Sequence, residues 1–209
     1  MSLLAFAFAA VVLAITPGPG IAYVVARTVA GGRAEGLASC LGTGLGGLLH
    51  VLAAALGLSL IVAQSALAFA VVKYLGAAYL IYLGLRLLLR GAGAADVGTV
   101  ARSGTRRAFS EGIAVEALNV KTALFFLAFL PQFVDPTRGA AWAQILALGL
   151  LFAALGFMSD ATWALVAGTL GDRLRHSRRF PSVQRYVSGS VFVGLGAVAA
   201  LTAPVKQPS

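Results

Sequence analysis

Long apolar runs separated by short polar segments dominate the chain. A membrane span needs roughly 20 apolar residues, and six stretches come close to or exceed that length: 3–26, 37–63, 67–89, 112–133, 140–170 and 186–203. The longest polar stretch, residues 90–107, divides the chain near its middle. The pattern predicts an all-α, polytopic membrane protein in which residues 1–209 form a single transmembrane domain.

Basic residues occur mainly in every second connection. The first, third and fifth connections and their flanks hold Arg27, Arg33, Arg86, Arg90, Arg102, Arg106, Arg107, Arg173, Arg175, Arg178, Arg179 and Arg185. The other connections and the tail hold only Lys73, Arg138 and Lys206. Cytoplasmic loops carry an excess of Lys and Arg. This distribution therefore predicts a bacterial-type inner-membrane protein with both termini on the outer side.

Six spans divide into two sets of three. Because each set contains an odd number of spans, the second set enters the membrane from the side opposite to the first. This is the topology of an inverted repeat. The expected boundaries are repeat one at about 1–90, a cytoplasmic linker at about 91–110, repeat two at about 111–203 and a tail at 204–209.

The first span is interrupted by helix-breaking residues. Each proline removes an N–H donor and each glycine allows close backbone approach, so two half-helices with free amides and carbonyls are expected. Such breaks are tolerated in a membrane where they are covered by protein or line a cavity. We predict a substrate site here, the alternative being a kink used only for packing. The interrupting residues are Thr16, Pro17, Gly18, Pro19 and Gly20.

The fourth span carries Glu116, Asn119 and Lys121 at its centre. Glu116 and Asn119 share a helix face, and a local break would bring Lys121 round toward Glu116 or a substrate carboxylate. Charges inside a membrane are functional hypotheses by default. Asn119 and Lys121 are thus predicted to bind substrate and Glu116 to couple protons. A purely structural ion pair is the alternative.

Asp160 in the fifth span and His50 in the second are further candidates for proton coupling. At 1.5 Å per helical residue, both breaks and Asp160 lie roughly 10–16 Å from the cytoplasmic face, and His50 lies about 20 Å from it. Four spans therefore bring polar groups to one level. The alternatives are a carboxyl hydrogen-bonded to a neighbouring helix and a packed, hydrogen-bonded histidine.

Composition supports the membrane prediction and excludes other classes. The chain is 59% hydrophobic and 11% charged, with one cysteine and two histidines. Its net charge of +9 follows from the basic connections, so no nucleic-acid partner is expected. The chain has a single cysteine and one histidine within its predicted spans, which are too few ligands for a transition-metal site, so no metal is expected. No nucleophile–base set or HExxH motif points to an enzyme, and no cofactor is expected.

Three stretches resemble the LysE-type translocator family of amino-acid exporters, which includes the threonine and homoserine/lactone exporters. They read TPGP at 16–19, YLGAAYLIYLG at 74–84 and NVKTALFFLAFLPQFV at 119–134. The family usually has asparagine where this chain has Gly20, and proline where it has Val120. The missing proline weakens the expectation of a break in the fourth helix.

The resemblance implies export of an amino acid or amino-acid derivative from the cytoplasm, coupled to protons by antiport with alternating access. The substrate carboxylate would meet the amides at Gly18 and Gly20, or Lys121, and its ammonium would meet Glu116 or Asp160. The expected partners are the substrate, protons and membrane lipids; homo-oligomer formation is left open. The alternative is an exporter of an inorganic ion or other small metabolite on the same fold.

Overall fold

The protein is described by a computed structural model that covers residues 3–58, 66–89, 102–175 and 180–201. All elements of the described part are helical, and none is a strand. The predicted tail at 204–209, most of the predicted linker and the ends of several predicted spans lie outside the described residues. The all-α prediction is therefore confirmed for the described chain.

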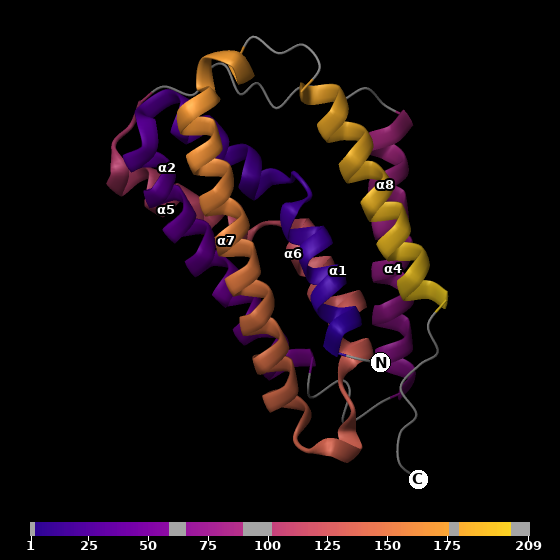
Figure 1. The fold of residues 1–209 in the computed structure, drawn as a ribbon. Coiled ribbons are helices and arrows are strands. Elements are labelled where there is room, and N and C mark those ends of the chain that lie inside the picture. The colour runs from indigo at the N-terminus through magenta and orange to yellow at the C-terminus, as the bar shows by residue number, and fades with distance from the viewer. Residues whose placement is uncertain (1–2, 59–65, 90–101, 176–179, 202–209) are drawn as a thin grey trace.

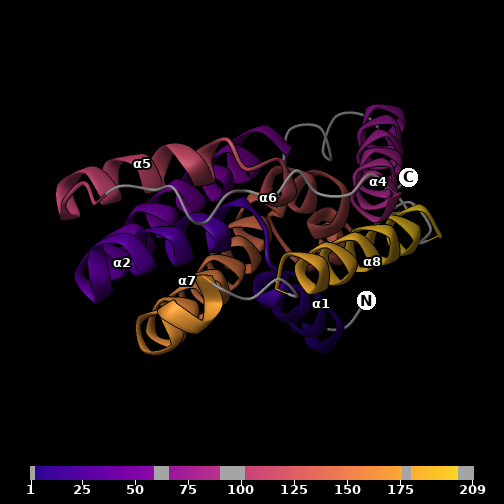
Figure 2. The ribbon, with the colours of Figure 1, turned by 90° about the horizontal axis from the view of Figure 1, so that it is seen from above.

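The helices form one bundle (Figure 1). In chain order they are α1 (Leu3–Ile15), α2 (Pro19–Ala53), η1 (Ala54–Leu58), α4 (Ala66–Leu89), α5 (Thr105–Ala117), α6 (Val120–Leu124), η2 (Phe125–Phe129), η3 (Leu130–Phe133), η4 (Pro136–Arg138), α7 (Ala141–Arg175) and α8 (Phe180–Leu201). Seen from above, α2, α5 and α7 form one group and α4 pairs with α8, with α1 and α6 between them (Figure 2).

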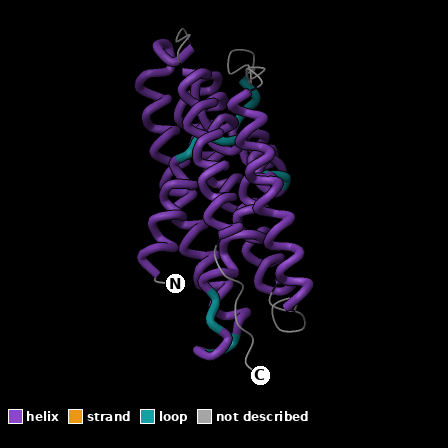
Figure 3. The backbone as a smooth tube through the Cα atoms, turned by 90° about the vertical axis from the view of Figure 1, so that its right-hand side faces the viewer, coloured by secondary structure: helices purple, strands orange, loops and turns teal. Residues whose placement is uncertain are grey.

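Three segments of the described chain are long and apolar enough to cross a membrane: Pro19–Gly57, Thr105–Phe133 and Ala141–Leu170. Most helices of the bundle run along one common direction (Figure 3). The number of six spans stays a prediction. Helix α5 begins at Thr105, within the stretch 91–110 expected to be linker.

Helix α2 has no loop between the first two predicted spans; instead it is kinked at Gly32. Gly32 has a φ of 80°, which favours glycine. Val24 and Cys40 pack in one cluster, although 16 residues of straight helix would span about 24 Å. The helix therefore turns back on itself at Gly32, as its path in Figure 1 also shows.

A charged cluster joins this turn to the start of α5. Arg27 is buried and pairs with Glu111 and, through Nη1, donates to Ser103 Oγ at 2.5 Å. Buried Glu35 accepts a hydrogen bond from the backbone N–H of Gly104 at 2.8 Å. Sequence patterning used Arg27 only as a marker of orientation. The structure shows that its charge is neutralised inside the protein.

Glycines set the close packing of α2 against α5. A Cβ on Gly46 would lie 2.6 Å from the carbonyl oxygen of Ile113, and one on Gly42 would collide with the backbone at Phe109. Small residues spaced four apart allow such approach between membrane helices. This close packing brings α5 against the second half of α2.

The substitution Gly42→Ala should therefore destabilise the protein by about 1–3 kcal/mol, because the added methyl group forces α5 away. Gly47→Ala is the matched control, since nothing lies within 4 Å of a Cβ there. It should leave stability unchanged or raise it by up to about 1 kcal/mol through helix propensity. Thermal unfolding of the purified protein in detergent measures both. Equal melting temperatures for the two variants would contradict this packing.

Candidate functional site

Two helix interruptions lie near each other at the centre of the bundle (Figure 1). The first separates α1 from α2, because α1 ends at Ile15 and α2 begins at Pro19. The second separates α5 from α6 at Leu118 and Asn119, although the chain has Val120 rather than proline after Asn119. The missing proline therefore does not prevent the break.

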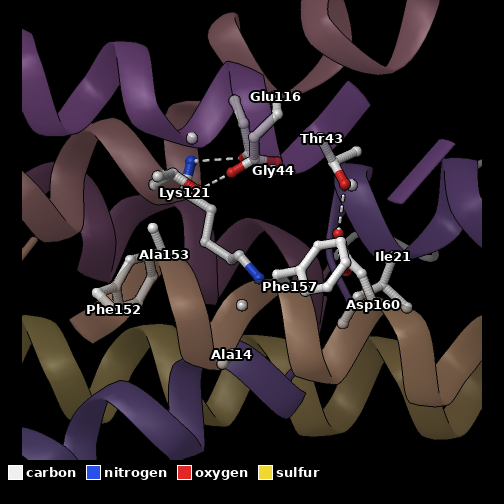
Figure 4. A pocket seen from close by; sticks show the side chains of 15 residues that line it. Ala14, Ile21, Thr43, Gly44, Glu116, Lys121, Phe152, Ala153, Phe157 and Asp160 are labelled. Carbon is white, nitrogen blue, oxygen red and sulfur yellow. Dashed lines mark hydrogen bonds between the residues drawn. The ribbon is translucent and has the colours of Figure 1, made fainter. Parts of the chain in front are cut away.

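A pocket lies between the two interruptions and encloses about 520 Å³ of space free of protein atoms, part of it open to the surroundings. Its polar lining consists of Thr43, Glu116, Asn119, Lys121, Thr122 and Asp160. Its remaining walls are Ala14, Gly20, Ile21, Gly44, Gly47, Phe152, Ala153, Gly156 and Phe157. Figure 4 shows Asp160 and Glu116 on different sides of the space, with the Lys121 side chain running between them.

Lys121 closes the end of α1. Its ammonium donates hydrogen bonds to the carbonyl oxygens of Leu13 at 3.3 Å and Thr16 at 3.1 Å. The last four carbonyls of a helix lack partners within the helix and carry partial negative charge. A buried ammonium at this position both satisfies them and is neutralised by them.

The other carbonyls around this break are satisfied by hydroxyl groups. Thr16 Oγ1 donates to Val12 O at 2.5 Å, and Ser159 Oγ of α7 donates to Ala14 O at 2.8 Å. Ser188 Oγ of α8 donates to Pro17 O at 2.5 Å. Together with Lys121 of α6, these contacts from α7 and α8 hold the interrupted backbone in place.

Gly18 and Gly20 are needed for close approach at the start of α2. A Cβ on Gly18 would lie 3.2 Å from the Lys121 side chain. A Cβ on Gly20 would lie 2.7 Å from Glu116 Oε2. The Glu116 carboxylate therefore lies against the first turn of α2, where the positive end of the helix dipole favours an anion.

Both Glu116 oxygens accept hydrogen bonds from neutral donors. Asn119 Nδ2 donates to Oε2 at 2.8 Å and Thr122 Oγ1 donates to Oε1 at 2.6 Å. Asn119 also caps α6, because its Oδ1 accepts from the backbone N–H of Lys121 at 3.1 Å. Lys121 is directed to the α1 carbonyls, and no ion pair joins it to Glu116 in the described structure.

Asp160 enters the pocket from α7. Its Oδ2 accepts a hydrogen bond from Thr43 Oγ1 of α2 at 2.6 Å. Ser159, its chain neighbour, holds α1 instead. The side chain of Asp160 thus faces the pocket beside Ile21 and Phe157 (Figure 4).

His50 lies behind the pocket rather than in its lining. Its Nε2–H donates to the backbone carbonyl of Glu116 at 2.8 Å, and its ring stacks on Phe126 with a centroid distance of 6.2 Å. The same carbonyl also accepts the backbone N–H of Asn119 at 2.9 Å, just beyond the end of α5 at Ala117. His50 therefore contacts the predicted proton carrier only through its backbone.

The structure brings together five of the residues singled out from the sequence: Gly20, Glu116, Asn119, Lys121 and Asp160 all line the pocket. Thr16, Pro17, Gly18 and Pro19 form the break behind it. Sequence reasoning missed Thr43, Thr122 and Ser159, which a search for hydroxyl side chains inside the apolar spans would have found. Phe152 and Phe157 gave no signal, because aromatic residues are common in membrane spans. The described residues contain no cluster of metal-ligating side chains.

Comparison with known proteins identifies related sequences. The family described as LysE type translocator matches residues 11–203. A homoserine/homoserine lactone efflux protein of Salmonella typhimurium is 31% identical, over 94% of this chain and 94% of that protein. A leucine efflux protein of Salmonella choleraesuis is 26% identical, over 90% of this chain and 89% of that protein. An uncharacterized membrane protein of Vibrio cholerae is 30% identical, over 92% of this chain and 93% of that protein. No solved structure matches.

Removing the Lys121 ammonium should destabilise the break. Lys121→Met removes this donor from both carbonyls, but the Leu13 carbonyl keeps the backbone N–H of Thr16 at 3.2 Å. The buried Thr16 carbonyl loses its donor, at a cost of about 1–3 kcal/mol. Gly18→Leu should act in the same direction by displacing the lysine. Arg138→Met, at an exposed basic residue, is the control. Thermal unfolding tests all three, and a Lys121→Met protein that melts like wild type would refute the capping role.

Proposed function

The chain belongs to the LysE type translocator family, and from this premise we propose that it exports an amino acid or amino-acid derivative from the cytoplasm. Relatives are named as efflux proteins, so the chain is a transporter and not an enzyme. The observation that carries the proposal is a pocket with two carboxylates, enclosed between two interrupted helices. Such sites near the centre of a bundle are typical of secondary transporters.

The proposal includes six spans in two inverted repeats. The first span is α1 with the first half of α2, and the fourth is α5 with α6 and η2. Contacts support this pairing: the second half of α2 packs on α5, α7 packs on α1 and α2, and α4 packs on α8. A two-fold axis that exchanges the repeats would turn each of these contacts into another of the set.

Proton antiport with alternating access would use the acids of the pocket. Asp160 is one carrier in this proposal, because it faces the pocket and is bound by a single hydroxyl group. Glu116 is the second, held by Asn119 and Thr122. His50 is the third candidate, although it lies behind the pocket and contacts Glu116 only through the backbone carbonyl. Protonation from the outer side would weaken the hold on the substrate ammonium and favour release.

The basic connections support a bacterial inner-membrane location with both termini outside. In that orientation the Arg27–Glu35–Glu111 cluster lies on the cytoplasmic side of the pocket, about 10 Å along α2 from Gly20. It joins the two repeats and would have to open for entry from the cytoplasm.

Efflux from proteoliposomes tests the export proposal. Vesicles are loaded with labelled amino acids and derivatives, and release is followed with and without an imposed pH gradient. Gradient-dependent release of a small class of compounds is expected. Absence of release across the panel, with the protein folded and oriented, would overturn amino-acid export and move the search to inorganic ions or other metabolites.

Substitution of the acids tests proton coupling. Asp160→Asn and Glu116→Gln should insert into the membrane normally but lose pH-dependent flux, because neither amide side chain can bind and release a proton. Asp135→Asn, at an exposed acid outside the pocket, is the control and should retain it. Full coupling in both pocket variants would refute this assignment.

A proton-carrying role of His50 can be separated from its structural role by a substitution that keeps a hydrogen-bond donor to the Glu116 carbonyl. His50→Gln offers an amide N–H to the Glu116 carbonyl but cannot titrate. If His50 carries protons, this variant loses pH dependence while its melting temperature stays near wild type. Retained pH dependence would restrict His50 to holding the end of α5.

A further inference from the structure

The charged lining of the pocket consists of two carboxylates and one ammonium: Glu116, Asp160 and Lys121. When all three are ionised, the pocket therefore carries a net charge of −1. A free amino acid is a zwitterion with no net charge, whereas an amino acid whose carboxyl group is blocked carries one positive charge. Charge complementarity is thus a property by which this site can choose between the two.

The first positive element of the site is already occupied. Lys121 is buried, and its hydrogen bonds to Leu13 O and Thr16 O use two of the three ammonium hydrogens. A substrate carboxylate that competed for the ammonium would expose the end of α1. Lys121 is therefore a structural cation, and its long side chain is held against Gly18.

The second positive element is the N-terminus of α2, and a carboxylate of the protein itself lies there. Glu116 Oε2 is so close to Gly20 that a Cβ on this residue would be only 2.7 Å away. Asn119 and Thr122 fix the carboxylate in this position. A substrate carboxylate placed at the same helix end would meet the like charge of Glu116.

Asp160 is the charged group that remains available. Its hydrogen bond from Thr43 involves Oδ2, and Oδ1 accepts none from the described residues. The wall beside it is apolar and includes Ile21 and Phe157, whereas Phe152 lines the far end of the pocket. The pocket thus offers an acceptor for an ammonium group beside a surface suited to a small apolar side chain.

From this arrangement we propose that the preferred substrate is a small primary amine of net charge +1, an amino-acid derivative whose carboxyl group is neutralised as an amide, ester or lactone. Its ammonium binds Asp160, and its side chain lies against Ile21 and Phe157. A free carboxylate would have to share Lys121 with the end of α1, and it faces two acids. This inference rests on the proposed export function and narrows its substrate class.

A matched set of three ligands tests the proposal on the wild-type protein. Leucine, leucinamide and N-acetylleucinamide share one side chain but differ in their charged groups. At a pH below about 7 the free α-amino group is protonated. Equilibrium binding to the purified protein and uptake in preloaded proteoliposomes should both favour leucinamide over leucine by about tenfold or more, since like charges brought together cost binding energy. N-acetylleucinamide should bind far more weakly than leucinamide.

Two variants separate the roles of the acids. Asp160→Asn removes the ammonium acceptor, so leucinamide binding should fall by about tenfold or more and the preference over leucine should vanish. Glu116→Gln keeps Asp160 as the ammonium acceptor but removes the negative charge at the N-terminus of α2 that would repel a substrate carboxylate. The affinity for leucine should therefore rise relative to that for leucinamide. Asp135→Asn should keep the wild-type ratio.

The outcomes distinguish this inference from the export proposal. Transport of leucine equal to or better than that of leucinamide overturns the inference and leaves amino-acid export intact. Equal binding of N-acetylleucinamide overturns it as well, because the ammonium would then be dispensable. Absence of transport for this set and for the full amino-acid panel overturns both proposals.

Discussion

Satisfaction of an interrupted backbone by buried side chains is the constraint on which the rest of this structure depends. In a membrane each unpaired N–H or carbonyl group costs several kcal/mol, so α1 cannot simply stop at Ile15. Lys121 reaches across from the second interruption to bind the carbonyls of Leu13 and Thr16, and Ser159 and Ser188 bind two more. The same contacts fix α6, α7 and α8 around the break, so the cap of one helix also organises the bundle.

The two interruptions compensate each other. The segment around the second break supplies the cation that closes α1, and it also supplies the anion, Glu116, that lies against the beginning of α2. The second break is in turn closed by Asn119, which caps α6, and by His50, which binds the Glu116 carbonyl near the end of α5. The dipoles of the half-helices are therefore balanced by side chains of the protein before any ligand enters.

This balance has a consequence for function. Charged residues in the middle of a membrane protein suggest substrate contacts, yet most charge here is committed to holding the half-helices. Asp160 differs, because it projects from an unbroken helix and, among the described residues, has Thr43 alone as its side-chain hydrogen-bond donor. Glycines complete the arrangement by letting α2 and α5 approach, which places Thr43 and Glu116 in the lining of one small space. In the proposed mechanism, protonation of Asp160 would change the affinity for substrate without removing the backbone caps.

The sequence by itself determined the helical class, the position of both interruptions and most of the polar residues at the site. These follow from local chemistry: apolar runs require helices in lipid, Pro17 and Pro19 remove backbone donors, and isolated charges inside apolar spans are conspicuous. Only the tertiary structure decided what each charge contacts. The direction of Lys121 toward α1 rather than Glu116, the break at Asn119 without a following proline, and the reversal of α2 at Gly32 all depend on groups distant in the chain. Hydrogen bonds between segments 100 or more residues apart, such as that from Lys121 to Leu13 with a separation of 108, leave no periodic signal along the sequence, because each partner is an ordinary residue until packing brings the two together.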